Sequence, residues 1–363
     1  MIYLDYQATT PLAPEAFAAM EPWLKDGFAN PHSAHAAGRA AAAAVEVARD
    51  QIAALLPTGG RVIFTSGATE AINLAIFGCG LLVSAAATEH AAVLDCLHAR
   101  RGQILPVSET GALSHPLGEG RTHGVSTKLE TNGTARLIAV MLVNNETGTI
   151  QPIAELARAA HAEGNLFLCD AVQAFGRMPI PHGPDMIAIS AHKIHGPKGI
   201  GALWVRDGIA LKPQMLGGGQ EQGMRSGTLS PALCAGFGAA AKLAAERMKA
   251  DAAHVADLWD RAVTGFANWT VNGSVTERYI GNLNIRREGV DASRLISECR
   301  NIAFSAGSAC ASGSGRPSHV LRALGLTDAQ AKSSIRLGFG RYTTVEEIDM
   351  AAAEINRAAE AML

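Results

Sequence analysis

The chain has 363 residues, of which 48% are hydrophobic and 18% charged, and its formal net charge at pH 7 is −2. This length suffices for one large hydrophobic core and a smaller second one. The near-neutral charge and an aromatic content of only 5% argue against nucleic acid or an anionic membrane surface as a partner.

The beginning of the chain, residues 1–15, carries acidic and polar side chains early, so we expect no secretory signal and a cytoplasmic location. No apolar run reaches the roughly 20 residues that span a bilayer. The cysteines are widely scattered without a CxxC pair, which favours reduced thiols over a disulfide framework or a zinc cluster. They are Cys79, Cys96, Cys169, Cys234, Cys299 and Cys310.

Seven short apolar runs in the first two thirds of the chain have the length and composition of β-strands. In chain order they are residues 61–67, 81–86, 103–108, 136–145, 165–173, 186–193 and 201–206. Helical patterns lie between several of them, at residues 68–77, 90–101 and 153–164. This alternation predicts an α/β fold with a mostly parallel seven-stranded sheet covered on both faces. Such sheets bind ligands outside the carboxyl ends of their strands.

A long alanine-rich helix is expected to begin after Pro231 and to end near Met248. The pattern then changes, because short strands mix with helices in an α+β manner; the strands are residues 279–286, 302–305 and 334–339. We therefore predict a large domain of residues 14–250 and a smaller α+β domain made of residues 1–13 and 251–363.

Polar side chains follow the ends of four predicted strands. Residues 65–70 open a helix, where backbone N–H groups suit either a phosphate or an ordinary capping turn. The strand at residues 136–145 ends in two amides. The strand at residues 165–173 ends in a carboxylate and an amide, and the strand at residues 186–193 ends in a hydroxyl, a histidine and a lysine. These residues are Asn144, Asn145, Asp170, Gln173, Ser190, His192 and Lys193. Each alone is readily structural, but together they place chemically different groups on neighbouring strand ends.

Lys193 discriminates between the possible chemistries. A lysine in a partly desolvated site has a lowered pKa and can form a Schiff base. Pyridoxal 5'-phosphate is the cofactor that uses such a lysine together with an acidic partner for its ring nitrogen and a phosphate cradle. A nucleotide P-loop needs a Gly-Lys pair and a zinc protease needs HExxH, and the sequence has neither. His192 and His195 could start a metal site, but no third ligand is evident, so we expect no metal.

The whole chain resembles the pyridoxal-phosphate-dependent cysteine desulfurases of the NifS/IscS type, within the class V aminotransferase group. Several separate motifs agree in order and spacing from one end to the other. They include YLDYQATTPLAPE (3–15), NPHSAHAAGR (30–39), FTSGATEAINLAI (64–76), TEHAAVLD (88–95), SAHKIHGPKGIGALWV (190–205), GGGQEQGMRSGT (217–228) and SAGSACASGSGRPSHVLRALG (305–325). The resemblance implies the pyridoxal-phosphate transferase fold of type I.

The resemblance also implies roles for individual residues. Lys193 would bind the cofactor, Asp170 would pair with its ring nitrogen, and His90 would stack on the ring and move protons. The remaining contacts are the ring ligands Asn145 and Gln173, the phosphate ligands Ala68, Thr69, Ser190 and His192, and the substrate ligands Asn30 and Arg336. Thr228 would reach the phosphate of a neighbouring subunit, which implies a homodimer.

Cys310 lies in a stretch of small residues without helical or strand periodicity, which is typical of a loop. Unreactive cysteines are usually buried, so a loop is an unusual place for a packing cysteine. The resemblance implies that its thiolate takes sulfur from L-cysteine as a persulfide, releases L-alanine, and passes the sulfur to an acceptor such as an iron–sulfur scaffold protein.

Two other readings remain open at this stage. One is a related enzyme: a selenocysteine lyase, which the Cys310 loop does not exclude, or a class V aminotransferase that uses no cysteine, which the loop disfavours. The other is a sulfur-relay or scaffold subunit without chemistry of its own, although the residues that carry the chemistry are all present. The sequence departs from the family pattern at Gln222, where arginine is common, and at His195, where an aromatic residue is common.

Overall fold

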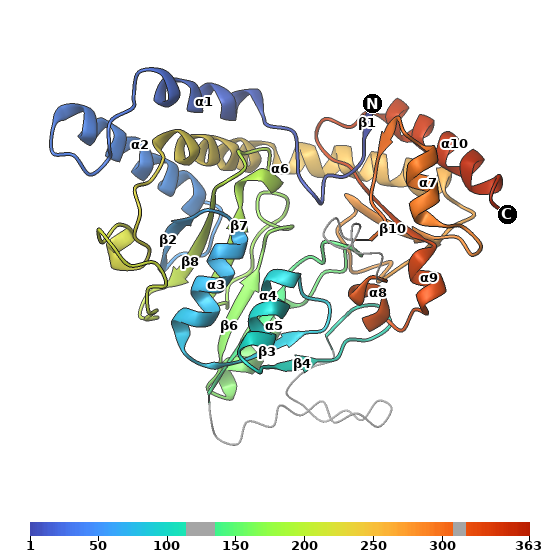
Figure 1. The fold of residues 1–363 in the computed structure, drawn as a ribbon, viewed down its shortest axis with the longest axis horizontal. Helices are drawn as coiled ribbons and strands as arrows, with labels where there is room; N and C mark the ends of the chain where they lie inside the picture. Colours follow the sequence, from blue (N-terminus) through green and yellow to red (C-terminus); the bar gives the residue numbers. More distant parts are fainter. Residues whose placement is uncertain (114–134, 308–316) are drawn as a thin grey trace.

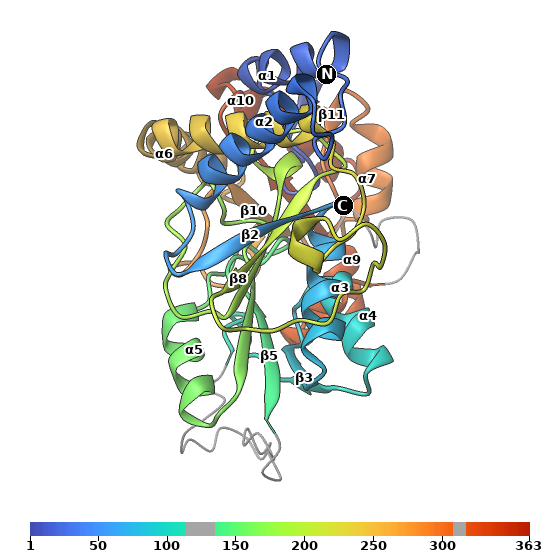
Figure 2. The ribbon, with the colours of Figure 1, turned by 90° about the vertical axis from the view of Figure 1, so that its left-hand side faces the viewer.

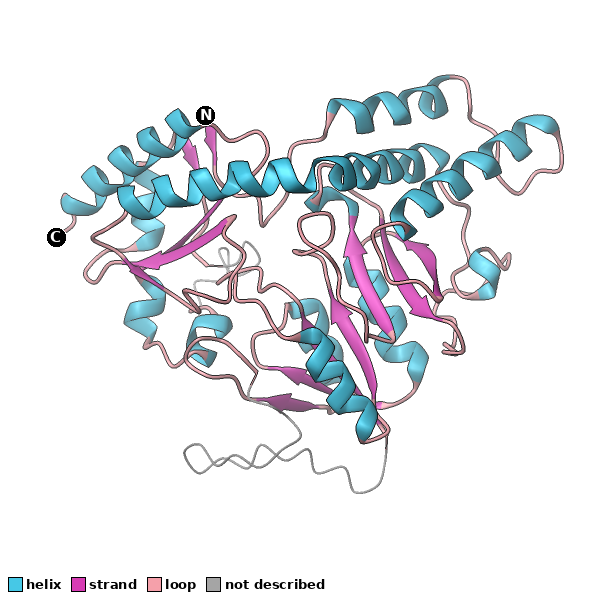
Figure 3. Ribbon diagram, turned by 180° about the vertical axis from the view of Figure 1, so that it is seen from behind, coloured by secondary structure: helices cyan, strands magenta, loops and turns pink. Residues whose placement is uncertain are grey.

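The computed structural model describes residues 1–113, 135–307 and 317–363. Figure 1 shows two lobes joined by a long helix, with both chain termini in the smaller lobe. The helix is α6 (Pro231–Gly265), and the same view turned by 180° shows it crossing from one lobe to the other (Figure 3).

The larger lobe contains a seven-stranded sheet. Its strands, in the order in which they lie side by side, are β2 (Gly60–Thr65), β8 (Gly201–Arg206), β7 (Met186–Ser190), β6 (Leu166–Asp170), β5 (Arg136–Met141), β3 (Leu82–Ala86) and β4 (Gln103–Leu105). Only β8 runs against its neighbours, so the other six strands point in one direction. The predicted mostly parallel sheet of an α/β fold is therefore confirmed.

Both faces of this sheet are buried under helices, as Figure 2 shows from the side. On one face Leu137 and Ala139 of β5 share a core with α3 (Ala68–Cys79) and α4 (Ala91–Ala99). The side chains that alternate with them, Ile138 and Val140, belong to the hydrophobic core on the other face of the sheet. That face is covered by α2 (Ala36–Ala53), α5 (Ile153–Ala162) and the first part of α6, next to α1 (Pro14–Lys25). Alternate residues thus face opposite layers, which explains why the strands read as continuous apolar runs.

The smaller lobe has its own buried cluster. A three-stranded antiparallel sheet has the order β12 (Ser334–Gly338), β10 (Asn282–Arg286) and β9 (Thr270–Val271), and β1 (Ile2–Tyr3) pairs in parallel with β11 (Ile302–Ala303). The helices of this lobe are α7 (Ala292–Glu298), α8 (His319–Ala323), α9 (Asp328–Lys332) and α10 (Val345–Glu360). The division at residues 14 and 250 stays a prediction, and this separate cluster, which includes Leu4 as well as Val255 and Ile355, supports it.

The expected end of α6 near Met248 is wrong, because the helix continues to Gly265. Residues 249–264 contain neither proline nor glycine, so nothing in them stops the helix. The packing changes instead: Phe237 and Ala241 lie in the large core, whereas Val255 and Leu258 lie in the small one. The change in composition marks where the helix passes from one core to the other, and not where it ends.

No helix within the described ranges is long and apolar enough to cross a membrane.

Candidate active site

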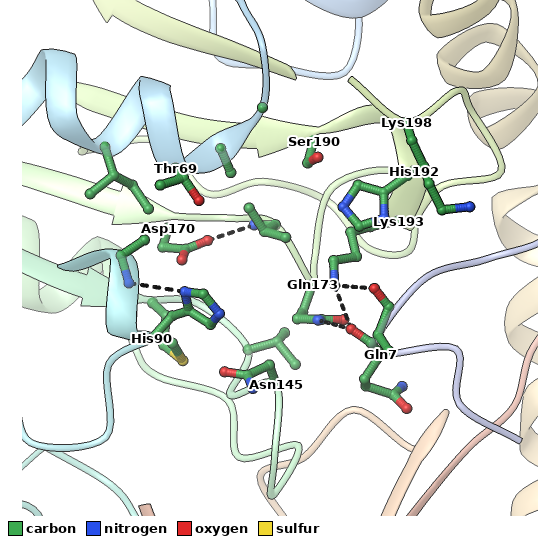
Figure 4. A pocket seen from close by; sticks show the side chains of 18 of the residues that line it. Gln7, Thr69, His90, Asn145, Asp170, Gln173, Ser190, His192, Lys193 and Lys198 are labelled. Atoms are coloured by element: carbon green, nitrogen blue, oxygen red, sulfur yellow. Dashed lines mark hydrogen bonds between the residues drawn. The ribbon is translucent and has the colours of Figure 1, made fainter. Parts of the chain in front are cut away.

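A cavity of about 380 Å³ lies at the carboxyl ends of the sheet strands. It is lined by residues that follow β2, β5, β6 and β7, together with the N-terminal segment and Arg336 of β12. The structure brings together ten of the residues predicted for the site. Two of them are Ala68 and Arg336. The others, labelled in Figure 4, are Thr69, His90, Asn145, Asp170, Gln173, Ser190, His192 and Lys193.

Lys193 does not end a strand as predicted, because β7 ends at Ser190 and Lys193 closes a 3₁₀ turn of residues Ala191–Lys193. Its ammonium donates to the carbonyl oxygens of Gln7 (2.5 Å) and Ala8 (2.8 Å) in the N-terminal segment. Burial, followed by the charges of Arg177 and Arg336, lowers the pKa of Lys193 to about 8. A substantial fraction of this amine is therefore neutral near pH 8 and able to attack a carbonyl carbon.

Asp170 and His90 lie on the side of the cavity opposite Lys193 (Figure 4). Asp170 is 7% exposed, and its Oδ1 accepts the backbone N–H of Val172 at 2.9 Å. Burial raises the pKa of Asp170, so a cationic ligand beside it would stabilise its charged form. His90 caps α4, where its Nδ1 accepts the N–H of Ala92 at 3.1 Å, which places the ring proton on Nε2. Burial lowers the pKa of His90 and keeps the ring neutral.

Two amides complete the middle of the cavity. Asn145 has a buried Oδ1 without a hydrogen-bond partner among the described residues, while its backbone oxygen accepts from Arg336 Nη1 at 2.9 Å. Gln173 donates from Nε2 to the carbonyl oxygen of Gln7 at 2.9 Å. A buried polar atom without a partner costs free energy, so the unpaired Asn145 oxygen indicates a ligand with a hydrogen-bond donor at this place.

The first turn of α3 forms one wall of the cavity, together with Ser66, Ser190 and His192. The N-terminal N–H groups of this 12-residue helix lack partners within the helix and attract an anion. Lys198 adds a positive charge on the same wall. Burial, then the Lys193 and Lys198 charges, lower the pKa of His192 to about 4, so a neutral imidazole and hydroxyl groups surround the place.

Arg336 is 1% exposed and connects the two lobes. Its Nη2 pairs with Asp5 Oδ1 at 2.7 Å and donates to Ser305 Oγ at 3.3 Å, while its Nε has no partner within the part of the chain that the structure describes. A guanidinium with an unpaired N–H in a polar cavity suits a carboxylate ligand.

Three predicted residues do not line the cavity in this single chain or cannot be placed. Asn30 and Thr228 are exposed and lie outside it. Cys310 lies outside the described residues. The other five cysteines are unpaired thiols, of which four are buried. The roles of these three residues stay predictions.

The sequence reasoning missed Gln7, Ala8 and Lys198, and also Arg177 just behind the cavity. The first two contribute backbone oxygens, which no side-chain pattern can reveal. The motif around Lys193 contains Lys198, and the N-terminal motif contains Gln7, so proximity to a recognised motif was the only available signal.

The model of the aminotransferase class-V family matches residues 2–350. The chain belongs to the class-V aminotransferase family. Cysteine desulfurase IscS of Anaeromyxobacter dehalogenans (strain 2CP-C) is 42% identical to this class-V chain over 368 residues, which cover 96% of the chain and 90% of that protein.

Two solved structures are similar to this class-V member along its length. The NifS-like protein from Rickettsia africae ESF-5 has a TM-score of 0.88 and 28% identity, with 99% of both chains covered. A structure of SspA in complex with cysteine has a TM-score of 0.80 and 32% identity, and covers 95% of this chain and all of SspA. Together with the sheet topology they confirm the predicted fold type.

His195 of this class-V member fastens the N-terminal segment to the Lys193 turn. Its ring lies edge-on to the rings of Tyr342 and Tyr6, with 4.9 and 5.9 Å between the ring centroids. Its Nδ1–H donates to the Pro11 backbone oxygen at 2.9 Å. It adopts φ 68°, which is uncommon outside glycine. The predicted departure at this position is therefore accommodated by a ring that keeps aromatic contacts and adds a hydrogen bond.

We expect His195 to make the protein sensitive to acid. Burial lowers its pKa from 6.5 to about 4, so the unfolded chain binds this proton more readily than the folded one. The contribution of neutral His195 to the free energy of unfolding is fully present above pH 6.5. It falls as the pH drops towards 4, with a loss of about 2 kcal/mol at pH 5. Thermal unfolding of the native protein and of His195→Phe at pH 7 and pH 5 measures this: the variant should lose less stability on acidification. Equal losses would contradict the assignment.

Proposed function

We propose that this protein is a pyridoxal-phosphate-dependent cysteine desulfurase, which converts L-cysteine to L-alanine and transfers the sulfur to Cys310. One observation carries the proposal: a partly buried lysine amine with a lowered pKa shares a cavity with a buried carboxylate, in a chain 42% identical to a cysteine desulfurase IscS. The side chains of the cavity supply the groups that the cofactor requires.

Asp170 is the partner for a protonated ring nitrogen, since it is a buried carboxylate that no cation of the described residues contacts by a hydrogen bond. His90 would cover one ring face, and Asn145 and Gln173 would bind the ring substituents. The first turn of α3, with Thr69, Ser190 and His192, would hold the phosphate; Ala68 belongs to the same turn. When bound, the cofactor supplies an electron sink for negative charge at the substrate Cα.

The chain's own residues carry the remaining steps. Arg336 would bind the substrate carboxylate and so fix which bond at Cα is broken. Asn30 lies outside this cavity, so its role as a second substrate ligand stays a prediction. Lys193 would take the Cα proton, with neutral His90 as a second group able to move it. The Cys310 thiolate would then attack the substrate sulfur: a sulfur–sulfur bond forms as the bond from Cβ to sulfur breaks and its electron pair passes to Cβ. Cβ then gains a proton, and Cα regains the proton that it lost, to give alanine.

The active assembly is proposed to be a cytoplasmic homodimer, because Thr228 would complete the phosphate site of a second subunit. Large apolar side chains on the surface support a partner: Phe28 is 88% exposed and Leu216 is 83% exposed. Such exposed apolar side chains are typical of interaction surfaces when they cluster. The persulfide would be passed on to an acceptor protein such as an iron–sulfur scaffold.

Product analysis tests the proposal directly. Purified protein with the cofactor is incubated with L-cysteine and a thiol reductant, and alanine and sulfide are quantified. Equal amounts of both are expected. Alanine from L-selenocysteine but not from L-cysteine would replace the proposal by a selenocysteine lyase. Pyruvate or a transamination product instead of alanine would assign another reaction of the family, and no bound cofactor at all would favour a relay subunit.

Asp170→Asn is expected to lower the turnover of cysteine by about 10² to 10³, because it removes the charge that keeps the ring nitrogen protonated. Its isosteric amide preserves the bond from the Val172 N–H. Steady-state alanine release beside cofactor affinity measures the effect. A loss in affinity with unchanged turnover would show that Asp170 only anchors the cofactor.

A further inference from the structure

We propose that Arg177 is a positioning residue of the active site: it orients the Gln173 amide and holds the Lys193 turn by hydrogen bonds from behind the cavity. This inference rests on the proposed function and deepens it, since it assigns a residue that sets how the cofactor's oxygen and its lysine are presented. Arg177 itself does not line the cofactor cavity.

The contacts of Arg177 converge on two site residues. Its Nη2 donates to the Lys193 backbone oxygen at 2.7 Å, and its Nη1 donates to Gln173 Oε1 at 2.9 Å. Longer bonds reach the Gln173 and Tyr6 backbone oxygens, at 3.3 and 3.4 Å. One guanidinium therefore links the loop after β6, the turn after β7 and the N-terminal segment.

The bond to Gln173 decides which end of its amide faces which neighbour. A guanidinium has only donors, so Gln173 must turn its oxygen towards Arg177. Its NH₂ group then points the other way and donates to the Gln7 oxygen at 2.9 Å. An NH₂ group has two hydrogens, so one stays available for an acceptor in the cavity. Arg177 thereby makes Gln173 a donor towards the cofactor, as an anionic ring oxygen requires.

The bond to Lys193 places a positive charge behind the amine. The charged groups that act on Lys193 are the cations Arg177 and Arg336 and the anions Asp170 and Asp5, with His90 and His192 nearby. Arg177 forms no ion pair with any acidic side chain of the described ranges, and its guanidinium lies over the Tyr279 ring at 5.4 Å. Its positive charge lowers the pKa of Lys193 and so favours the uncharged form of a nitrogen at the end of that side chain.

Three variants separate orientation from charge. Arg177→Met removes both the hydrogen bonds and the charge. Arg177→Lys keeps the charge but cannot reach two acceptors with a rigid fork. Gln173→Met removes the amide and leaves Arg177 in place. The matched control is Arg294→Met, whose guanidinium pairs with Glu298 on the surface of α7.

The experiment uses the protein loaded with pyridoxal 5'-phosphate and no cysteine. The visible absorbance of the lysine-bound cofactor is titrated with pH, and the cofactor dissociation constant is measured by equilibrium dialysis. In Arg177→Met the apparent pKa of the absorbance change should rise by about one pH unit, and the affinity for the cofactor should fall about tenfold. Arg177→Lys should keep the native pKa and lose affinity, and Gln173→Met should do the same. Arg294→Met should change neither.

The outcomes are distinguishable. A native pKa and native affinity in Arg177→Met, even with a lowered melting temperature, would overturn the inference and leave Arg177 a structural residue. If Arg177→Met does not fold, Arg177→Lys and Gln173→Met decide by affinity: unchanged values in both would overturn it. Failure of the native protein to form a lysine-bound cofactor would instead overturn the proposed function, and this inference with it.

Discussion

Replacement of Lys193 by alanine should reduce cysteine turnover by about 10⁴, the upper end of what a positioned proton-transfer group contributes. The reason is twofold: the amine is the only lysine nitrogen in the described part of the chain that donates to the segment of Gln7 and Ala8 inside the cavity, and it carries a lowered pKa. The variant should still fold, because the lost contacts are two hydrogen bonds to backbone oxygens at the edge of a cavity.

Two measurements check this expectation. Alanine release from L-cysteine should fall to the assay background, and the visible absorbance of the lysine-bound cofactor should disappear while the free aldehyde form remains. Lys198→Ala is the matched control, since Lys198 also lines the cavity. It should retain the lysine-bound absorbance. Native turnover in Lys193→Ala would remove Lys193 from the chemistry.

Cys310→Ser should abolish sulfide release and alanine formation from L-cysteine together, and leave cofactor binding unchanged. A serine hydroxyl is hardly ionised at neutral pH, and an oxygen cannot accept sulfur as a persulfide. Mass spectrometry of the native protein after one turnover without reductant should show a mass increase of one sulfur atom on the peptide that contains Cys310.

Cys79→Ser is the control for that experiment, because Cys79 is an unpaired thiol that is partly exposed and lies on α3, away from the cavity residues. Burial raises its pKa, which disfavours the thiolate. The control should release alanine and sulfide at the native rate. Continued alanine release from Cys310→Ser would mean that another group accepts the sulfur, or that it leaves as free sulfide, and the selenocysteine lyase reading would regain support.

Much of the large lobe could be predicted from the sequence because its signals are local. A strand buried on both faces needs apolar residues at every position, so β5, β6 and β7 are recognisable in the sequence as apolar runs. In a parallel sheet the carboxyl ends of such strands lie at one edge, so the polar residues that follow them could be predicted to lie close together. The antiparallel direction of β8 was not predicted, because a fully apolar strand reads the same in either direction. The end of β7 was placed too late, at Lys193 instead of Ser190, because no glycine or proline separates the strand from the 3₁₀ turn that follows it.

The remaining features depend on contacts between residues far apart in the chain. The pair of Asp5 with Arg336 joins residues 331 positions apart, and the bond of Lys193 to Gln7 spans 186. No periodicity encodes such pairs, because they arise only after both cores have formed. Arg177 was missed for the same reason: on its own element it is a charged residue in a turn, and only the fold brings Gln173, Lys193 and Tyr6 around it.

The continuous course of α6 has a consequence for how the chain can change. The helix rotates by about 100° per residue, so its apolar stripe must stay in step with both cores along its whole length. One residue inserted near Asp251 would turn the second half by about 100° and face polar side chains towards Leu4 and Ile355, whereas seven inserted residues would nearly restore the phase. The helix therefore fixes the rotation of its small-lobe half relative to its large-lobe half. Insertions that do not disturb either core are expected in the surface loops and not in α6.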